Sequence, residues 1–308
     1  MHRNVARAFD RASGRYDQDA ALQFDVREAL LARLSLTRLV PSTILDAGAG
    51  TGHASKALKR RYPRARVIAL DIAAGMLRQA ARQQTLFRKF GRVCADAAKL
   101  PFADGRVDLI FSNLMLQWCD PDPVLAEFRR VLSPGGCLTL TSYGPDTLRE
   151  LRTAWAAVEV RPHVNLFIDM HDLGDALVRA GFAAPVLDVE RYTLNYADVP
   201  ALLRDLKSIG ANTLLSGSGR GLTGRGKFHA MQHAYERFRK DDRLPASYEV
   251  VFANAWAPTK SARPGEGSPR DTSPGEGSPR DTSPGETRVS LEALSAELRK
   301  SKTGRRPP

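Results

Sequence analysis

Cysteine is scarce in this chain of 308 residues, and long hydrophobic runs are absent. The three cysteines, Cys94, Cys119 and Cys137, lack the close spacing of a Cys-x-x-Cys pair or of a Cys/His zinc site. We therefore expect neither a disulfide framework nor a metal site, and a reducing cytoplasm as the compartment. No apolar run approaches the roughly 20 residues that a membrane helix needs.

The N-terminal segment lacks the apolar stretch of a secretory signal peptide. Residues Met1–Asp10 are charged, and the acidic residues Asp17 and Asp19 follow soon after. Mitochondrial presequences are basic but poor in acidic residues, so this start does not fit one either. Both observations agree with the expected cytoplasmic location.

Acidic residues are fewer than basic ones, and the excess of positive charge is uneven. The net charge is +12, and residues 200–243 hold nine basic side chains against four acidic ones. Such a segment favours an acidic partner surface or a phosphate-bearing ligand, although a solvated helix face would have the same composition.

From Pro258 onward the composition changes abruptly. The decapeptide Pro264–Ser273 recurs unchanged as Pro274–Ser283, and neither copy contains a large apolar residue. A segment of this kind cannot bury a core, and the repeats of solenoid proteins are longer and carry hydrophobic ridges. We therefore expect a disordered tail over residues 258–308 and one folded domain over residues 1–257.

Within the predicted domain, strand-like apolar runs alternate with helical stretches. Strands are expected at 43–47, 66–71, 92–95, 107–112 and 137–142, and helices at 53–61, 74–83 and 123–131. Further along the chain, a helix is expected at 171–180 and long strands at 186–196 and 247–256. This alternation is typical of an α/β protein with a parallel sheet and helices on both faces.

Three segments lie outside this repeating pattern. Residues 5–39 have a helical pattern without an internal proline, and residues 145–168 and 198–243 interrupt the later core elements. The last of these contains a Gly/Ser-rich stretch at 216–226, which is typical of a flexible connection between helices. We expect these segments, with the N-terminal one taken as about 1–40, to form a helical lid over a ligand.

The most informative motif is Ile44–Gly52, an apolar run that ends at Asp46 and continues into glycines at alternate positions, Gly48, Gly50 and Gly52. This pattern predicts a strand followed by a turn whose backbone a ligand can approach closely. The next strand ends at Asp71, where a carboxylate of a βαβ unit can hold both hydroxyls of a ribose. A tight turn without a ligand is the alternative.

The spacing of the glycines resembles the first motif of S-adenosylmethionine (SAM) dependent methyltransferases. A dinucleotide-binding fingerprint would need a third glycine where His53 stands. The resemblance implies a Rossmann-like class I fold with seven strands, mostly parallel, and an antiparallel last strand. It implies SAM as the cofactor and the following cofactor-binding residues: Asp46, Gly48, Gly50, Gly52, Asp71, Ile72, Met76, Asp96, Ala97 and Asn113.

Two of these residues, Met76 and Asp96, could instead have a purely structural role. Met76 would serve equally well as part of a helix core. Asp96 follows a strand and could accept a hydrogen bond from an adenine amino group, but an aspartate in this place can also cap a helix. Asn113 ends the fourth strand, where it would face the reacting methyl group.

Segments outside the core resemble a more specific family, the malonyl-acyl-carrier-protein O-methyltransferases of biotin synthesis. The similar segments are Val5–Asp17, Ser142–Arg152, Asp205–Thr213, Arg220–Gly226 and Leu244–Phe252. The resemblance implies methylation of the free carboxylate of a malonyl thioester on acyl carrier protein. A carboxylate has a pKa near 4, so it needs orientation and desolvation and no general base.

The resemblance also suggests which residues orient the acceptor and where its carrier binds. The candidates for orientation are Tyr16, Tyr143 and Arg149, with Arg152 and His171 as further possibilities. Acyl carrier proteins are acidic, which gives the basic segment 200–243 a docking role.

Several alternatives stay open at the level of sequence. One is an enzyme that methylates another small acceptor, such as a quinone or a phenol. Another is a SAM-binding assembly factor without catalysis. The thioester could also be carried by coenzyme A. Methylation of nucleic acid is compatible with the charge, but Asn113 is not followed by the Pro-Pro-aromatic sequence that grips an exocyclic amine.

Overall fold

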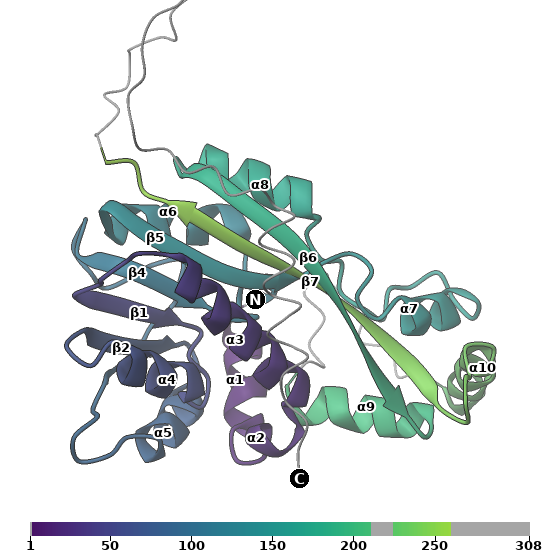
Figure 1. Cartoon of the computed structure of the whole chain (residues 1–308). Helices are drawn as coiled ribbons and strands as arrows, with labels where there is room; N and C mark the ends of the chain where they lie inside the picture. Colours follow the sequence, from purple (N-terminus) through teal and green to yellow (C-terminus); the bar gives the residue numbers. More distant parts are fainter. Residues whose placement is uncertain (1, 211–223, 260–308) are drawn as a thin grey trace, which may run out of the picture. The chain divides into compact units, whose positions relative to one another are not determined.

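A seven-stranded mixed sheet forms the centre of the fold (Figure 1). The computed structural model describes residues 2–210 and 224–259, which all belong to one unit of the chain. The strands are β1 (Thr43–Ala47), β2 (Arg66–Asp71), β3 (Gly91–Cys94), β4 (Val107–Ser112), β5 (Leu132–Tyr143), β6 (Ala183–Tyr196) and β7 (Leu244–Trp256). Their order is β3-β2-β1-β4-β5-β7-β6.

The direction of the strands confirms the predicted fold class. Strands β1 to β5 run parallel, and β7 is antiparallel to both of its neighbours, β5 and β6. In β1 the four residues after Thr43 are all buried. Burial on both faces is what a parallel sheet covered by helices requires, and it explains the continuous apolar runs in the sequence.

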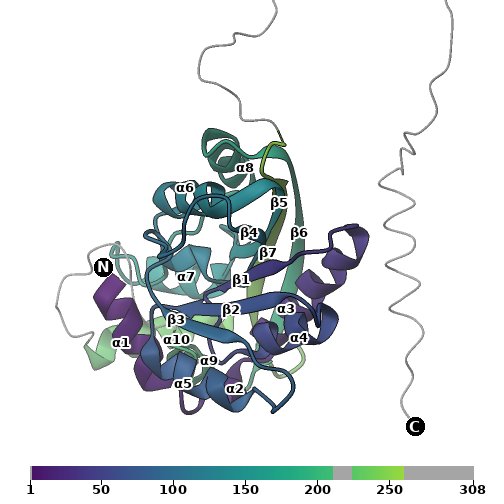
Figure 2. The same cartoon turned by 90° about the vertical axis from the view of Figure 1, so that its left-hand side faces the viewer.

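Helices cover both faces of this sheet (Figure 2). They are α1 (His2–Ala12), α2 (Tyr16–Asp19), α3 (Ala21–Arg33), α4 (His53–Arg61), α5 (Ala74–Arg82), α6 (Pro121–Val131), α7 (Arg149–Ala156), α8 (Met170–Arg179), α9 (Val199–Ser208) and α10 (Arg225–Glu236), with short 3-10 turns at Leu34–Leu36 and Leu116–Trp118.

Two hydrophobic clusters fix the helices to the sheet. One contains Val26 of α3 and Leu58 of α4, and the other contains Phe128 of α6 and Leu173 of α8. Each of these four side chains is fully buried. Burial of one side chain of this size contributes about 1.5–3 kcal/mol, so the two clusters supply most of the energy that orders the layers.

The N-terminal segment differs from the prediction of continuous helix over 5–39. It is divided into α1, α2 and α3, with breaks at residues 13–15 and at Ala20. The hydroxyl of Ser13 donates a hydrogen bond to the carbonyl of Asp10 at 2.8 Å. A side chain that bonds to the nearby backbone competes with the helical ladder, which accounts for the first break.

The last strands extend beyond the rest of the sheet. The pairing of β5 with β7 ends at Tyr143 and Val250, whereas β7 continues to pair with β6 as far as Leu244. Helices α7 and α9 pack on this extension, and α10 packs against α7 (Figure 1). The helices described within the predicted segments 145–168 and 198–243 therefore gather around one end of the sheet.

Some predicted features lie outside the described residues. They are residues 260–308 of the expected tail and most of the Gly/Ser-rich stretch at 216–226. In the part of the chain that is described, no helix is both long and apolar enough to cross a membrane.

One glycine of the turn after β1 generates a test of the fold. Gly52 has φ +82°, and a Cβ there would lie 2.7 Å from Cβ of Ala80 in α5. An alanine there would destabilise the fold through backbone strain, by about 1–2 kcal/mol, and through overpacking, by about 1–3 kcal/mol. We expect Gly52→Ala to lower the free energy of unfolding by about 2–4 kcal/mol in urea denaturation.

Gly14 provides the matched control. A Cβ at Gly14 meets no atom within 4 Å, and its φ is not positive. Gly14→Ala should change the free energy of unfolding by less than about 1 kcal/mol. Equal effects of the two substitutions would contradict the packing role of Gly52.

Candidate active site

The turn between β1 and α4 has three glycines in the left-handed region. Their φ values are +72° for Gly48, +53° for Gly50 and +82° for Gly52. A Cβ at Gly48 would overlap the side chain of Met115, whereas a Cβ at Gly50 would stand in open space. Gly48 and Gly50 line a cavity, so their bare backbone leaves room for a ligand.

The structure assigns Gly52 a different position from the predicted one. Gly52 directly precedes α4 and packs against Ala80 and Phe90, and it does not line the cavities beside the turn, although its neighbours Thr51 and His53 do. It was expected to contact a cofactor. Its lack of a side chain is instead explained by the close approach of α5.

Two buried carboxylates flank the glycine turn. Asp46, in β1, accepts a hydrogen bond from the hydroxyl of Ser55 at 2.5 Å, and burial raises its pKa to about 7. Asp71, at the end of β2, accepts from the backbone N–H groups of Gly50 at 2.9 Å and Ala73 at 2.8 Å. Burial raises the pKa of Asp71 to about 6.

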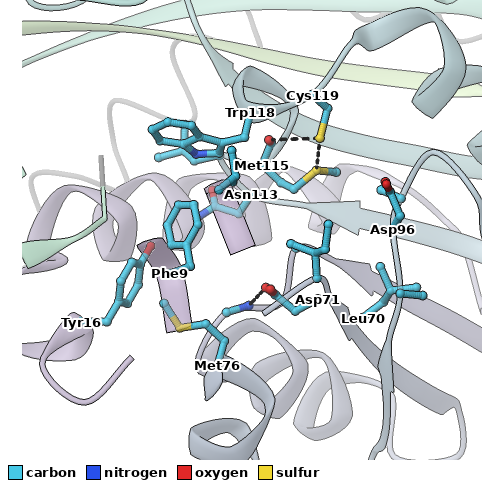
Figure 3. Close-up of a pocket in the computed structure, with 17 residues that line it drawn as sticks. Phe9, Tyr16, Leu70, Asp71, Met76, Asp96, Asn113, Met115, Trp118 and Cys119 are labelled. Atoms are coloured by element: carbon cyan, nitrogen blue, oxygen red, sulfur yellow. Dashed lines mark hydrogen bonds between the residues drawn. The ribbon is translucent and has the colours of Figure 1, made fainter. Parts of the chain in front are cut away.

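The cavity beside the turn, which we call the main cavity, has a volume of about 710 Å³. It lies at the carboxyl ends of β1, β2 and β4, where ligands of open α/β sheets bind. Eight of the ten predicted cofactor residues line it: Gly48, Gly50, Asp71, Ile72, Met76, Asp96, Ala97 and Asn113. Figure 3 shows the aromatic residues Phe9, Tyr16 and Trp118 on one side of this cavity and Asp96 on the other.

Two of the lining residues also have structural hydrogen bonds. The carboxylate of Asp96 accepts from the N–H of Ala98 at 2.9 Å, which closes a turn of the backbone. The amide of Asn113 donates to the carbonyl of Gln23 at 3.1 Å and accepts from the hydroxyl of Thr141 at 2.9 Å. Asn113 therefore ties α3 to the end of the sheet while it lines the cavity.

A second cavity, the side cavity, adjoins the main one. It shares Tyr16, Gly48, Gly50 and Asn113 with the main cavity and has a volume of about 720 Å³. Asp46, the ninth predicted cofactor residue, lines this cavity. The turn and its flanking carboxylates thus face one continuous space.

Arg27 also lines the side cavity, and the sequence analysis missed it. Its side chain is only 12% exposed, and its guanidinium lies over the ring of Phe24 at 4.4 Å. Burial raises the pKa of Tyr16 and of Asp46, and the positive charge of Arg27 opposes a small part of this rise at both groups. The available signal was the spacing of Gln23 and Arg27, which puts these two polar residues on one side of the helix.

A third cavity, the outer chamber, is surrounded by α7, α9 and the segment after α7. Its volume is about 1040 Å³, and its walls include Leu151, Trp155 and Leu206. Trp118 lines both this chamber and the main cavity. The ring of Trp118 packs edge-on against Phe9 with 5.4 Å between centroids, so this aromatic pair marks the junction of the two spaces.

Two of the predicted acceptor-orienting residues lie at these cavities. Tyr16 begins α2 and lines the main and side cavities, and Tyr143 ends β5 and lines the outer chamber. Burial raises the pKa of both phenols, and the Asp71 carboxylate adds to the effect at Tyr16. Both side chains are therefore neutral at physiological pH and can donate a hydrogen bond.

The other predicted acceptor-orienting residues lie elsewhere. Arg149 lines none of these three cavities, and its side chain is 58% exposed with its Nε atom 3.3 Å from Glu150. Arg152 donates to the carbonyls of Pro145 and Thr147 and so holds the loop before α7. His171 is exposed at the start of α8. A direct contact of these residues with an acceptor stays a prediction.

Two non-glycine residues with positive φ line the cavities. Leu114, with φ 50°, follows β4 at the main cavity, and Leu148, with φ 55°, precedes α7 at the outer chamber. The N–H of Leu114 donates to the hydroxyl of Thr141 at 2.9 Å, which holds its turn in place. Strained backbone is common at binding sites, because surrounding structure must fix the lining residues.

The strand order, the glycine turn and the flanking carboxylates define a class I SAM-dependent methyltransferase. A family described as a methyltransferase domain matches residues 45–140. The fold is similar to a crystal structure described as a methyltransferase from Bacillus halodurans, with a TM-score of 0.54, 19% identity, and coverage of 75% of this chain and 99% of that chain.

Curated relatives narrow this class to one family. A malonyl-[acyl-carrier protein] O-methyltransferase of Methylovorus sp. is 52% identical over 82% of this chain and 88% of the relative. One from Laribacter hongkongensis is 51% identical over 84% of this chain and 90% of the relative. The chain belongs to the malonyl-[acyl-carrier protein] O-methyltransferase family.

The residues present fit SAM, the cofactor of this class. Asp71 keeps lone pairs that can accept two ribose hydroxyls, and Asp96 stands at the opposite end of the cavity from the aromatic cluster. The side cavity combines the acid Asp46 with the cation Arg27. A zwitterionic amino acid, such as the methionine part of SAM, needs this combination of opposite charges.

Asp71 generates a test of cofactor binding. The ionised carboxylate is the stronger acceptor, and hydrogen bonds to charged groups contribute about 1.5–3 kcal/mol. We expect Asp71→Asn to weaken SAM binding about 10- to 100-fold at pH 8, measured by calorimetry. Since the pKa of Asp71 is about 6, SAM affinity of the unmodified protein should fall as the pH drops through 6 and approach that of the variant.

Asp122→Asn is the control, because this carboxylate is 63% exposed and pairs with Arg179 at the surface. It should leave SAM affinity unchanged at each pH. If Asp71→Asn bound SAM as tightly as the unmodified protein at pH 8, Asp71 would not hold the cofactor.

Arg27 generates a second test. We expect Arg27→Met to weaken binding of S-adenosylhomocysteine by at least about tenfold, because its guanidinium would pair with the ligand carboxylate. Binding of 5′-methylthioadenosine, which lacks the amino-acid part, should change by less than about twofold. Both dissociation constants can be measured by calorimetry.

Arg60→Met controls for the loss of a surface charge, since Arg60 is exposed on α4. It should affect neither ligand. Equal weakening of both ligands by Arg27→Met would show that Arg27 acts on the fold of the cavity and not on the carboxylate.

Proposed function

We propose that the protein is a SAM-dependent O-methyltransferase that converts the free carboxylate of a malonyl thioester on acyl carrier protein to its methyl ester, in an early step of biotin synthesis. The observation that carries the proposal is the pair of spaces that meet at Trp118. One space fits the methyl donor, and the other can take an extended acceptor. The names of the curated relatives support the same reaction.

The reaction needs little from the protein beyond alignment and desolvation. Bound SAM supplies a methyl group that its sulfonium has already activated. The malonyl carboxylate is ionised at neutral pH, so no residue has to remove a proton. Phe9 and Trp118 close the junction with apolar surface, which excludes water and holds the nucleophile in line.

The neutral phenols are suited to orient the acceptor. Tyr16 reaches the donor side of the junction and Tyr143 the acceptor side, and each can donate one hydrogen bond to a carboxylate or thioester oxygen. We propose that these two residues hold the acceptor. Arg149, at the start of α7, lines none of the three cavities and stays a predicted third orienting residue.

The outer chamber fits the thioester and the arm that bears it. Its walls are mostly apolar, and the imidazole of His163 adds a polar group. The ring of His163 is stacked on Trp155 at 3.7 Å, and its Nε2 atom lies 2.6 Å from Glu159. This part of the wall is therefore held in one position before a ligand enters.

We further propose that residues 1–257 form the catalytic domain and that about 1–40, 145–168 and 198–243 form the lid over the acceptor. The carrier protein would dock on the basic segment 200–243. Some cations of this segment are engaged within the protein: Lys227 pairs with Glu159, and Arg239 pairs with Glu236. Arg204 and Lys207 make no side-chain hydrogen bond to a described residue and are available to a partner.

A direct assay tests this function. Malonyl-carrier protein incubated with the protein and SAM should gain the mass of one methyl group on its malonyl moiety. Leu206→Trp should fill part of the outer chamber and lower the rate of methylation at least about tenfold, without changing SAM affinity. Mass spectrometry measures the rate and calorimetry the affinity.

Leu36→Trp is the matched control, because Leu36 is an exposed residue outside the chamber. It should leave the rate unchanged. If the protein binds SAM and leaves malonyl-carrier protein unmodified, the proposed substrate is wrong. Methylation of a quinone or a phenol by the same preparation would then identify the other class of acceptor.

A further inference from the structure

A groove with a volume of about 1810 Å³ lies between the N-terminal helices and α9. Figure 1 shows α9 beside α1 and α2, and contacts between α2 and α9 agree with this arrangement. Four cations stand along the groove: Arg11 and Arg15 from the N-terminal segment, and Arg204 and Lys207 from α9. Residues that are nearly 200 positions apart in the sequence thus form one basic surface.

The four cations are exposed and have no partner within the described part of the chain. None of them makes a side-chain hydrogen bond or an ion pair there, whereas Arg33, Arg130 and Arg239 each do. Four unpaired cations beside one groove repel each other, so the surface gains stability from an anionic partner.

The groove contains two carboxylates, Asp19 and Asp205, which do not neutralise it. The hydroxyl of Tyr196 donates to Asp205 at 2.5 Å, and burial raises the pKa of this carboxyl group. The excess of positive charge therefore remains at the surface.

Each helix of the groove has a second face that lines a cavity of the site. On α1, Val5 and Phe9 face the main cavity, whereas Ala8 and Arg11 face the groove. Val5 and Phe9 are four positions apart, and Ala8 and Arg11 are three positions apart, so each pair lies on one face of the helix. Helix α1 would therefore separate a partner bound in the groove from the main cavity.

The same division holds for α9. Leu203 and Leu206 face the outer chamber, whereas Arg204 and Lys207 face the groove. Close packing joins the two helices, since a Cβ at Gly210 would lie 3.1 Å from the ring of Phe9. Phe9 contacts Trp118, so the walls of the groove meet beside the junction of the two cavities.

We propose that this groove is the docking surface for the acidic face of the acyl carrier protein, with the N-terminal arginines as essential as the cations of α9. This inference rests on the proposed function and sharpens it. Within the basic segment 200–243, the cations that line the groove are those of α9, Arg204 and Lys207, whereas Lys227 and Arg239 are held in ion pairs elsewhere. A carrier bound here presents its malonyl arm next to the outer chamber.

Charge reversal in two separate double variants tests the proposal. One variant combines Arg11→Glu with Arg15→Glu, and the other combines Arg204→Glu with Lys207→Glu. Each should raise the KM for malonyl-carrier protein and the Kd for labelled carrier protein about tenfold or more, with a weaker salt dependence, because the reversed charges repel an acidic partner. The kcat should stay within about twofold.

Malonyl-pantetheine, which has neither a protein nor a phosphate, serves as the small acceptor. Its KM should be the same in both variants and in the unmodified protein. The control variant combines Arg60→Glu with Arg64→Glu on an exposed surface around the end of α4 and should change neither acceptor.

The outcomes separate this inference from the proposed function. If the unmodified protein methylates malonyl-carrier protein and either groove variant retains its KM and Kd, the docking surface is wrong. An equal rise of KM for malonyl-coenzyme A would also overturn the proposal, since the groove would then bind the phosphates of a small thioester. If no malonyl acceptor is methylated, the proposed function fails, and the Kd for carrier protein still decides the docking surface.

Discussion

The hydrogen bond from the backbone N–H of Gly50 to the carboxylate of Asp71 organises the site. It joins the turn after β1 to the end of β2, and the second oxygen of Asp71 holds the N–H of Ala73 at the start of α5. Burial makes the negative charge of Asp71 energetically costly, and the hydrogen bonds from these two N–H groups reduce that cost. A ligand that donates further hydrogen bonds to Asp71 would reduce the cost again. The local electrostatics thus favour a ligand with hydroxyl groups.

The rest of the site depends on how far β6 and β7 extend beyond the sheet. The first residues of β7, Leu244–Glu249, pair only with β6, and this ribbon carries the helices that surround the outer chamber. The parallel strands provide the main cavity, whereas the ribbon carries part of the wall of the outer chamber. Trp118 lines both spaces, so the proposed donor and acceptor sites adjoin at this residue.

Helices with two functional faces connect these spaces to the surface. In α1 and α9, residues three or four positions apart face a cavity, and other positions of the same helices carry cations at the groove. Movement of either helix would change the cavity and the groove together. Such coupling gives a physical route by which docking of a carrier could affect how tightly the acceptor is held, since both depend on the same packed helices.

The sequence by itself determined the core elements, because their patterns are local. The strand at Thr43–Ala47, the three glycines and Asp71 follow from hydrophobic runs and short spacings, and the structure has them where they were expected. The tertiary structure decided which side chains meet. Gly52 is a packing residue because α5 approaches it, Arg149 does not line the outer chamber, and Arg27 reaches the side cavity from α3. The groove joins Arg11 to Lys207, and contacts between such distant residues depend on how helices pack, which no local pattern records.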